Sequence, residues 1–310
     1  MHDDESAASG AAPRDPLARI GVVVVSFRSA AHLPPLLASL PVDRFASVVV
    51  VDNASDDGSV TAARSVPGVT VVAGESNVGF GAACNRGAAL VAPAADLLLF
   101  LNPDARITAA GLLRLAGHLD AHPGAGLVGP RLWRDGQPLP SSGERATLRS
   151  ELRRYAPGTL ARRLPNRRHD PHRDLTGPVA YVEGACMLAR RAAFDEVGGF
   201  DPAYFLFFEE LDIADRLRAR GWTVELVADA VAEHEVAASR RSTGDDSRPV
   251  LVESTVRYLA QHRGPVAARL WVWAVRPLWA LRVRRGQLSR AERAAYVAAT
   301  RRARRAEPRS

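Results

Sequence analysis

The chain has 310 residues, of which 47% are apolar and 24% charged, enough for one large domain or two modest ones with a full core. The sequence contains no lysine, so all 41 basic side chains are arginines, and the formal net charge is +7. The missing lysine excludes a Walker A phosphate loop, a Schiff-base enzyme and a protein kinase, each of which depends on one.

The N-terminal segment and the cysteines indicate the cellular compartment in which the protein is expected. Residues 1–17 are polar, small and acidic at the start, unlike a signal peptide, and we expect a disordered leader. Two cysteines, Cys84 and Cys186, exclude a disulfide framework and a Cys-rich zinc site, and they favour a reducing cytoplasm. The longest apolar stretch, 270–283, is interrupted by an arginine and a proline and is too short for a membrane span. We therefore expect a soluble or peripheral protein.

Short runs of β-branched residues alternate with segments of helical periodicity over the first 130 residues. This alternation predicts an α/β fold, with an open, mostly parallel sheet that has helices on both faces. The predicted strands are 20–26, 47–51, 69–73, 96–101 and 126–129. The predicted helices are 33–40, 56–66, 79–91 and 108–121.

The pattern lapses over 143–174, an Arg-rich stretch with several prolines that predicts a long loop with short helices at most. His169 and His172 lie in this loop, where a polar histidine pair is more often solvated than metal-bound. Beyond the loop, the sequence predicts strands at 178–188 and 222–227 and a helix at 209–220.

The segment 249–310 is predicted to be helical, with Trp271, Trp273 and Trp279 among apolar residues and arginines. Tryptophan beside arginine suits the headgroup layer of an anionic membrane. The same pattern fits a helical appendage packed on the main domain, and the sequence leaves both readings open. We expect no nucleic-acid partner, since no nucleic-acid-binding motif accompanies the basic tail.

Three of the predicted strands end in polar residues or are followed directly by them. These residues are Ser26, the pair Asp52 and Asn53, and the pair Asn102 and Asp104. Parallel sheets bind ligands beyond the carboxyl ends of their strands. Asp104 could hold a divalent cation against a diphosphate, because Mg²⁺ typically takes one or two carboxylates plus substrate phosphates. Alternatively, an Asp at this place caps the next helix.

Three further segments carry candidate chemistry. The turn 52–58 could grip a nucleoside, or its side chains could only cap a helix. The small residues of 77–87 permit close approach of a ligand, or tight packing of a helix on the sheet. Glu209 and Glu210 stand among aromatic residues, where desolvation raises a carboxyl pKa toward that of a working base. They also suit the first turn of a helix, which favours acidic residues.

Taken in order, these segments resemble the inverting, GT-A-fold glycosyltransferases of family 2, most closely the bacterial rhamnosyltransferase branch. The resemblance runs from about residue 20 to 234, and the tail is similar to that of actinobacterial enzymes that add rhamnose to a polyprenyl-linked sugar. The matching segments are Val22–Arg28, Val51–Ser55, Asn77–Gly81, Leu101–Ala105, Gly184–Leu188, Gly198–Asp201, Phe208–Asp212, Arg216 and Gly221–Trp222.

The resemblance implies a GT-A catalytic domain over 18–248, with a nucleotide-binding half (18–130) and an acceptor half (131–248). In it, Asp104 belongs to the family's DxD motif and holds Mg²⁺ or Mn²⁺ on the donor diphosphate, and His234 completes the metal site. The implied donor-binding residues are Ser26, Arg28, Asp52, Asn53, Asn77, Gly79, Asn102 and Gly184.

Glu210 matches the family's catalytic base, although the usual residue there is Asp. One additional methylene moves the carboxylate by about 1 Å, enough to matter for catalysis. Glu209 and Asp212 are therefore alternative catalytic residues.

The implied reaction transfers L-rhamnose from dTDP-rhamnose to a glycan or a polyprenyl-diphosphate-linked sugar in cell-envelope polysaccharide synthesis, at the inner face of the plasma membrane. A UDP-sugar donor, a small-molecule acceptor and a binding protein without catalysis stay open as alternatives. A dinucleotide-dependent oxidoreductase is disfavoured, because no Gly-rich turn directly follows the first strand. A sugar-nucleotide nucleotidyltransferase would need a basic Gly-rich loop with lysine.

Overall fold

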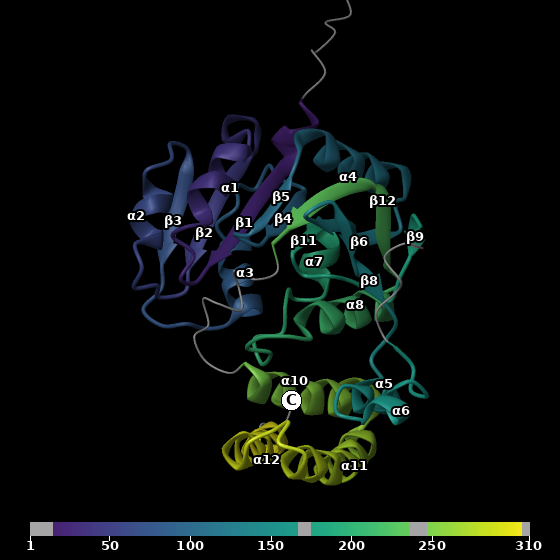
Figure 1. Cartoon of the computed structure of the whole chain (residues 1–310). Helices are drawn as coiled ribbons and strands as arrows, with labels where there is room; N and C mark the ends of the chain where they lie inside the picture. The colour runs from purple at the N-terminus through teal and green to yellow at the C-terminus, as the bar shows by residue number, and fades with distance from the viewer. Residues whose placement is uncertain (1–14, 167–174, 236–246, 306–310) are drawn as a thin grey trace, which may run out of the picture.

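A computed structural model describes residues 15–166, 175–235 and 247–305 (Figure 1). Most of the expected leader, and both His169 and His172, lie outside the described residues. The main sheet runs in the order β3-β2-β1-β4-β11-β6-β12-β5, with β7 beside β6 and β9 beside β12. A two-stranded sheet pairs β8 with β10.

The strands are β1 (Ile20–Ser26), β2 (Ser47–Asp52), β3 (Val69–Ala73), β4 (Leu97–Leu101), β5 (Ala105–Ile107), β6 (Ala125–Arg134), β7 (Gln137–Leu139), β8 (Ser142–Gly143), β9 (Gly177–Pro178), β10 (Tyr181–Val182), β11 (Cys186–Arg190) and β12 (Thr223–His234). The α-helices are α1 (Leu33–Ser39), α2 (Ser59–Arg64), α3 (Phe80–Ala88), α4 (Ala109–Ala121), α5 (Leu148–Arg153), α6 (Gly158–Ala161), α7 (Arg191–Glu196), α8 (Glu209–Ala219), α10 (Arg248–Arg263), α11 (Pro265–Arg284) and α12 (Arg290–Arg305). Short 3-10 helices span Pro16–Arg19 and Val42–Arg44.

The period-2 alternation of strand side chains divides the core into two layers. On β1, Val22 and Val24 face a hydrophobic cluster formed with α1, α2 and α4. Val23 and Val25 face the other cluster, which includes α3, α7 and α8. Both faces of the sheet are thus covered by helices, which confirms the expected α/β architecture with its mostly parallel sheet.

The predicted single strand at 178–188 is wrong. Its residues form the two short strands β9 and β10 and the start of β11, which runs antiparallel between β4 and β6. The predicted strand 222–227 is the first half of β12, which continues past a bulge after Val227. The continuation pairs with β5 and places His234 opposite Ala105. This pairing brings the end of β12 to the carboxyl end of β4.

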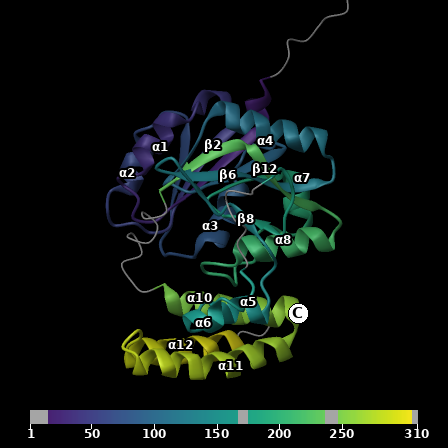
Figure 2. The same ribbon diagram turned by 45° about the vertical axis from the view of Figure 1, so that its right-hand side comes forward.

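The C-terminal helices α10, α11 and α12 form a layer beside α5 and α6, on the far side of α8 from the sheet (Figures 1 and 2). Trp271 and Trp279 are fully buried there, and the ring centroid of Trp279 lies 5.7 Å from that of Tyr155 and 5.2 Å from that of Tyr296. Trp273, in contrast, is 78% exposed. Trp271 and Trp279 therefore fit the predicted packed appendage, and a membrane contact of Trp273 stays a prediction. Among the helices described, none has the length and apolar character needed to cross a bilayer.

Candidate functional site

A pocket of about 270 Å³ opens at the carboxyl edge of β1, β2 and β4. It lies between this edge, the segment before β11, the loop before α8 and the end of β12. Its lining includes Phe27, Asn53, Asn77, Gly79, Asn102, Pro103, Glu183, Gly184, Ala185, Phe205, Leu206, Phe207, Glu209, Glu210 and His234. Segments far apart in the sequence thus meet at the edge where open α/β sheets bind ligands.

Asp104 and His234 face each other beside this pocket because β5 pairs with the end of β12. The Nε2 atom of His234 lies 3.3 Å from Oδ1 of Asp104. Both carboxylate oxygens of Asp104 are buried and have no hydrogen-bond partner. Burial acts to raise the pKa of Asp104, but His234, with smaller contributions from the backbone amide of Asp104 and from His32, lowers the pKa below its ordinary value. A buried carboxylate with a lowered pKa, beside an imidazole, fits a divalent cation.

The pocket carboxylates Glu209 and Glu210 begin α8 directly after a strained turn. Phe207 and Phe208 have φ angles of 68° and 72°, the left-handed region that costs an L-residue about 1–2 kcal/mol. Such strain persists only where surrounding contacts hold it.

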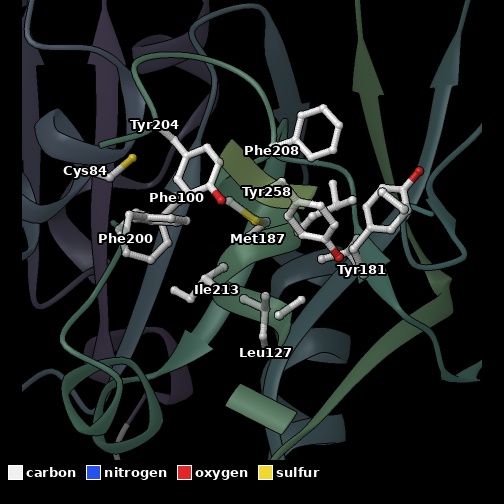
Figure 3. Packing of buried hydrophobic residues seen from close by; sticks show 14 of the residues in the cluster. Cys84, Phe100, Leu127, Tyr181, Met187, Phe200, Tyr204, Phe208, Ile213 and Tyr258 are labelled. Carbon is white, nitrogen blue, oxygen red and sulfur yellow. The ribbon is translucent and has the colours of Figure 1, made fainter. Parts of the chain in front are cut away.

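Helix α10 supplies those contacts. The ring of Phe208 packs on Tyr258, with centroids 5.2 Å apart, and the Ser254 hydroxyl donates a hydrogen bond of 2.8 Å to the Leu206 carbonyl. Figure 3 shows Phe208 and Tyr258 in the buried cluster that also contains Tyr204. The Tyr204 hydroxyl donates to the Gln261 side chain, 3.1 Å away. The C-terminal layer therefore stabilises the turn that aims the two carboxylates.

Gly79 contacts the turn before α8 from the side opposite to α10. Its φ is +89°, and a Cβ at this position would stand 2.3 Å from the Phe205 carbonyl oxygen, which accepts a hydrogen bond from the Phe80 amide. Asn77 accepts from the Gly79 amide, and the Asn53 side chain donates to the Gly79 carbonyl. The close approach of two loops explains the glycine, and the two asparagines are held where they line the pocket.

Glu209 is the more buried of the two carboxyl groups, and one of its oxygens has no hydrogen-bond partner. Burial, with smaller contributions from Glu210 and Asp212, raises the pKa of Glu209 well above its ordinary value. The folded protein therefore favours the neutral acid at this position.

Replacement of Glu209 by Gln should raise the melting temperature at about pH 8 and change it much less near about pH 5. A carboxyl group with a raised folded pKa stabilises fully below its unfolded pKa, about 4.3, and this contribution is lost as the pH rises toward the folded value. Gln is neutral throughout and avoids that loss, and each kcal/mol shifts the melting temperature of a chain of this length by about 1.5 °C. Thermal unfolding of both proteins across this range measures the effect, and a difference that is constant with pH would contradict it.

Asp212 does not line the pocket. Its carboxylate accepts a 2.7 Å hydrogen bond from Nε of Arg216, lies 2.8 Å from Nε2 of His262 and accepts from Gln261. These partners occupy both oxygens and tie α8 to α10. The structure therefore separates Asp212 from the two glutamates with which the sequence grouped it.

Three expected donor-binding residues stand behind or beside the pocket lining. Asp52 accepts hydrogen bonds from the amide and hydroxyl of Ser55, which fixes the loop after β2. Arg28 is partly exposed and pairs with Asp56 at 3.0 Å. The Ser26 hydroxyl is buried and has no hydrogen-bond partner. For all three, contact with a donor stays a prediction.

Several residues that line the pocket were not predicted from the sequence. Glu183 precedes Gly184 in the segment predicted as a single strand. That prediction gave no reason to place the Glu183 side chain at a pocket. The aromatic run before α8 contains Phe205, Leu206 and Phe207. Its composition predicts core packing and gives no indication of a ligand. The hydrophobic part of the pocket wall comes largely from this run.

Comparisons with known proteins identify the family of this chain. Residues 21–198 match the model of glycosyl transferase family 2. The chain is 33% identical over 281 residues to the N-acetylglucosaminyl-diphospho-decaprenol L-rhamnosyltransferase of Mycobacterium tuberculosis (strain H37Rv), a match covering 84% of this chain and 90% of that relative. A shorter match, 34% identical over 85 residues, is to rhamnosyltransferase WbbL of Escherichia coli K12, covering 27% of this chain and 32% of that relative. Among solved structures, the crystal structure of GalNAc-T7 with UDP, GalNAc and Mn²⁺ has a TM-score of 0.57 and is 14% identical in sequence. The match covers 78% of this chain and 48% of that larger chain, and it shows a shared fold.

Proposed function

Because this chain belongs to glycosyltransferase family 2, we propose that it transfers L-rhamnose from dTDP-rhamnose to N-acetylglucosamine carried on a polyprenyl diphosphate. The observation that carries the choice of sugar and acceptor is the 33% identity to the mycobacterial rhamnosyltransferase along nearly the whole of both chains. We assign catalysis to residues 18–248 and support of the catalytic turn to 249–310.

In this proposal, the donor lies along the carboxyl edge of the sheet, against Asn53, Asn77 and Asn102. Asp104 and His234 would hold Mg²⁺ or Mn²⁺, and their unpartnered, buried atoms support this assignment. When bound, the cation would neutralise the negative charge that develops on the departing diphosphate.

Glu210 is the proposed general base. Its carboxylate takes the proton of the acceptor hydroxyl as that oxygen bonds to the anomeric carbon, while the bond from that carbon to the diphosphate breaks. The attack and departure occur on opposite faces of the carbon, so the configuration inverts. Glu209, whose ionised form is disfavoured by burial, is the alternative base in the same pocket.

A membrane-facing surface on α11 would bring the enzyme to such an acceptor. Val266, Leu270 and Trp273 recur at helical spacing and are 62%, 53% and 78% exposed. Arg269 and Arg276 are exposed on the same helix, and residues 265–284 contain no acidic side chain. An exposed apolar stripe with an indole and flanking arginines suits the headgroup layer of an anionic bilayer.

The variant Trp273→Ser should bind vesicles containing anionic lipid about tenfold or more weakly than the wild type. Burying one large apolar side chain contributes roughly 1.5–3 kcal/mol. Cosedimentation with such vesicles measures the loss, and added salt should weaken wild-type binding further. Leu175→Ser, at a residue 79% exposed elsewhere on the molecule, is the matched control. Equal binding by the two variants would remove α11 as the docking surface.

The proposed function is tested by incubating the chain with Mg²⁺, a polyprenyl-diphosphate N-acetylglucosamine acceptor, and either dTDP-rhamnose or UDP-sugars. We expect a rhamnosylated lipid from the first donor only. Transfer from a UDP-sugar alone would replace the proposed donor, and transfer to a soluble sugar alone would replace the acceptor. Donor binding without transfer or hydrolysis would indicate a sugar-nucleotide-binding protein.

A further inference from the structure

A second group of potential metal ligands lies at the opposite end of β12 from His234. His118 lies in the last turn of α4, His122 is the C-cap residue of that helix, and Glu225 stands near the start of β12. One ligand atom from each of the three side chains lies within 4.8 Å of the other two. Helix α4 packs along β12, so the two histidines and the glutamate come from elements that already touch (Figure 1).

The hydrogen bonds of His122 leave one ring nitrogen available. Its Nδ1 lies 2.9 Å from the backbone carbonyl oxygen of His118. Because a carbonyl oxygen can only accept, Nδ1 carries the hydrogen, and Nε2 of the neutral ring keeps its lone pair. Metal-ligating histidines are commonly oriented in this way, with the second nitrogen donating to a carbonyl or carboxylate.

The carboxylate of Glu225 is anchored by one oxygen and presents the other to the imidazoles. Oε1 accepts a hydrogen bond from the Thr223 hydroxyl at 2.5 Å, and Oε2 lies 2.7 Å from Nε2 of His118. Glu225 is buried, His118 is partly buried and His122 is exposed. The site is therefore built on a fixed carboxylate, and an ion can enter past the exposed ring.

We propose that His118, His122 and Glu225 bind a first-row transition-metal ion such as Zn²⁺, separately from the cation of the catalytic pocket. Two imidazoles and one carboxylate suit Zn²⁺, Co²⁺ or Ni²⁺, whereas Mg²⁺ prefers oxygen ligands alone. Three protein ligands leave the fourth tetrahedral position to water. The ion takes the place of the proton between His118 and Glu225, and that proton leaves to solvent. Metal binding then links the end of α4 to the strand that carries His234 at its other end.

The test uses the untagged, EDTA-treated full chain, titrated with Co²⁺ in excess Mg²⁺ and followed by visible absorption and calorimetry. We expect tight binding of one Co²⁺ by the wild type and displacement by Zn²⁺. His122→Ala should weaken this binding at least about tenfold, since loss of an outer-shell partner alone costs about 10–100-fold. His122 is exposed, so its replacement leaves the core intact, and Zn²⁺ should raise the melting temperature of the wild type but not of this variant.

Leu113→Ala, at a half-exposed position of the same helix, is the control and should bind Co²⁺ like the wild type. Equal Co²⁺ affinity in the wild type and His122→Ala would overturn the proposal. Absence of tight Co²⁺ binding by the wild type would also overturn it and would mean that His118 and Glu225 form an ion pair only. Because every readout is metal binding or thermal stability, the result does not depend on the proposed transferase activity.

Discussion

Replacing Glu210 by Gln is expected to lower the rate of sugar transfer by about 10²- to 10⁴-fold, the usual contribution of a general base. Gln keeps the size of the side chain but cannot take up the proton of the acceptor hydroxyl. Donor affinity should stay near the wild-type value, because the groups assigned to the donor lie along the sheet edge and around Asp104. Single-turnover transfer and calorimetric donor binding, measured on the same preparation, separate the two effects.

Two companion variants identify which carboxyl group is the base. Glu209→Gln should retain most of the activity if Glu210 is the base, because Gln keeps the size of the side chain and removes only a carboxyl group whose ionised form burial disfavours. Glu210→Asp should retain more activity than Glu210→Gln, because a carboxylate remains, although it reaches about 1 Å less far. If Glu209→Gln is the inactive variant and Glu210→Gln is active, the roles of the two residues are exchanged. If both are active, neither residue is the base.

Strands β1, β2 and β4 could be predicted because each is an apolar, largely buried run with its own boundaries. Strand β5 was not predicted, because its three residues carry no strand pattern of their own and it forms by pairing with the distant β12. The buried run of β1 and the all-apolar β4 have no competing helical interpretation at their length. The region 177–190 was misjudged because its three short strands are separated by turns of only a few residues. Sequence periodicity cannot show that β11 leaves its neighbours and inserts antiparallel between β4 and β6, since that choice is made by long-range pairing.

The site was predictable where polar residues follow strands and less so elsewhere. Asn53 and Asn102 line the pocket as expected, because parallel strands bring their carboxyl ends to one edge. Asp212 was grouped with Glu210 by proximity in sequence, yet α8 turns it toward His262. The support from Ser254 and Tyr258 was not predictable, because nothing local in α10 indicates that it packs against a strained turn. Such constraints act between segments about 50 residues apart.

The second large effect is expected at Asp104. Asp104→Asn should weaken donor binding in the presence of Mn²⁺ by about 100-fold or more, because loss of a metal ligand should cost at least as much as loss of an outer-shell partner, about 10–100-fold. Asn keeps the volume of the side chain and removes the negative charge, and it removes a buried carboxylate that has no hydrogen-bond donor in the free protein. Because the carboxylate stabilises the fold through His234, the variant should also lose some stability, and its melting temperature is measured to show that it is folded at the temperature of the binding experiment.

The result that identifies Asp104 as a metal ligand is that donor affinity no longer depends on the cation, in addition to being weak. For the wild type, EDTA should lower donor affinity strongly, whereas for Asp104→Asn the affinities with Mn²⁺ and with EDTA should be similar. Asp96→Asn, at the exposed opposite end of β4, is the matched control and should keep the full response to Mn²⁺. A wild-type response to Mn²⁺ in Asp104→Asn would place the cation elsewhere. Because His234 reaches Asp104 through the β5–β12 pairing, His234→Ala should show the same loss of cation dependence in weaker form.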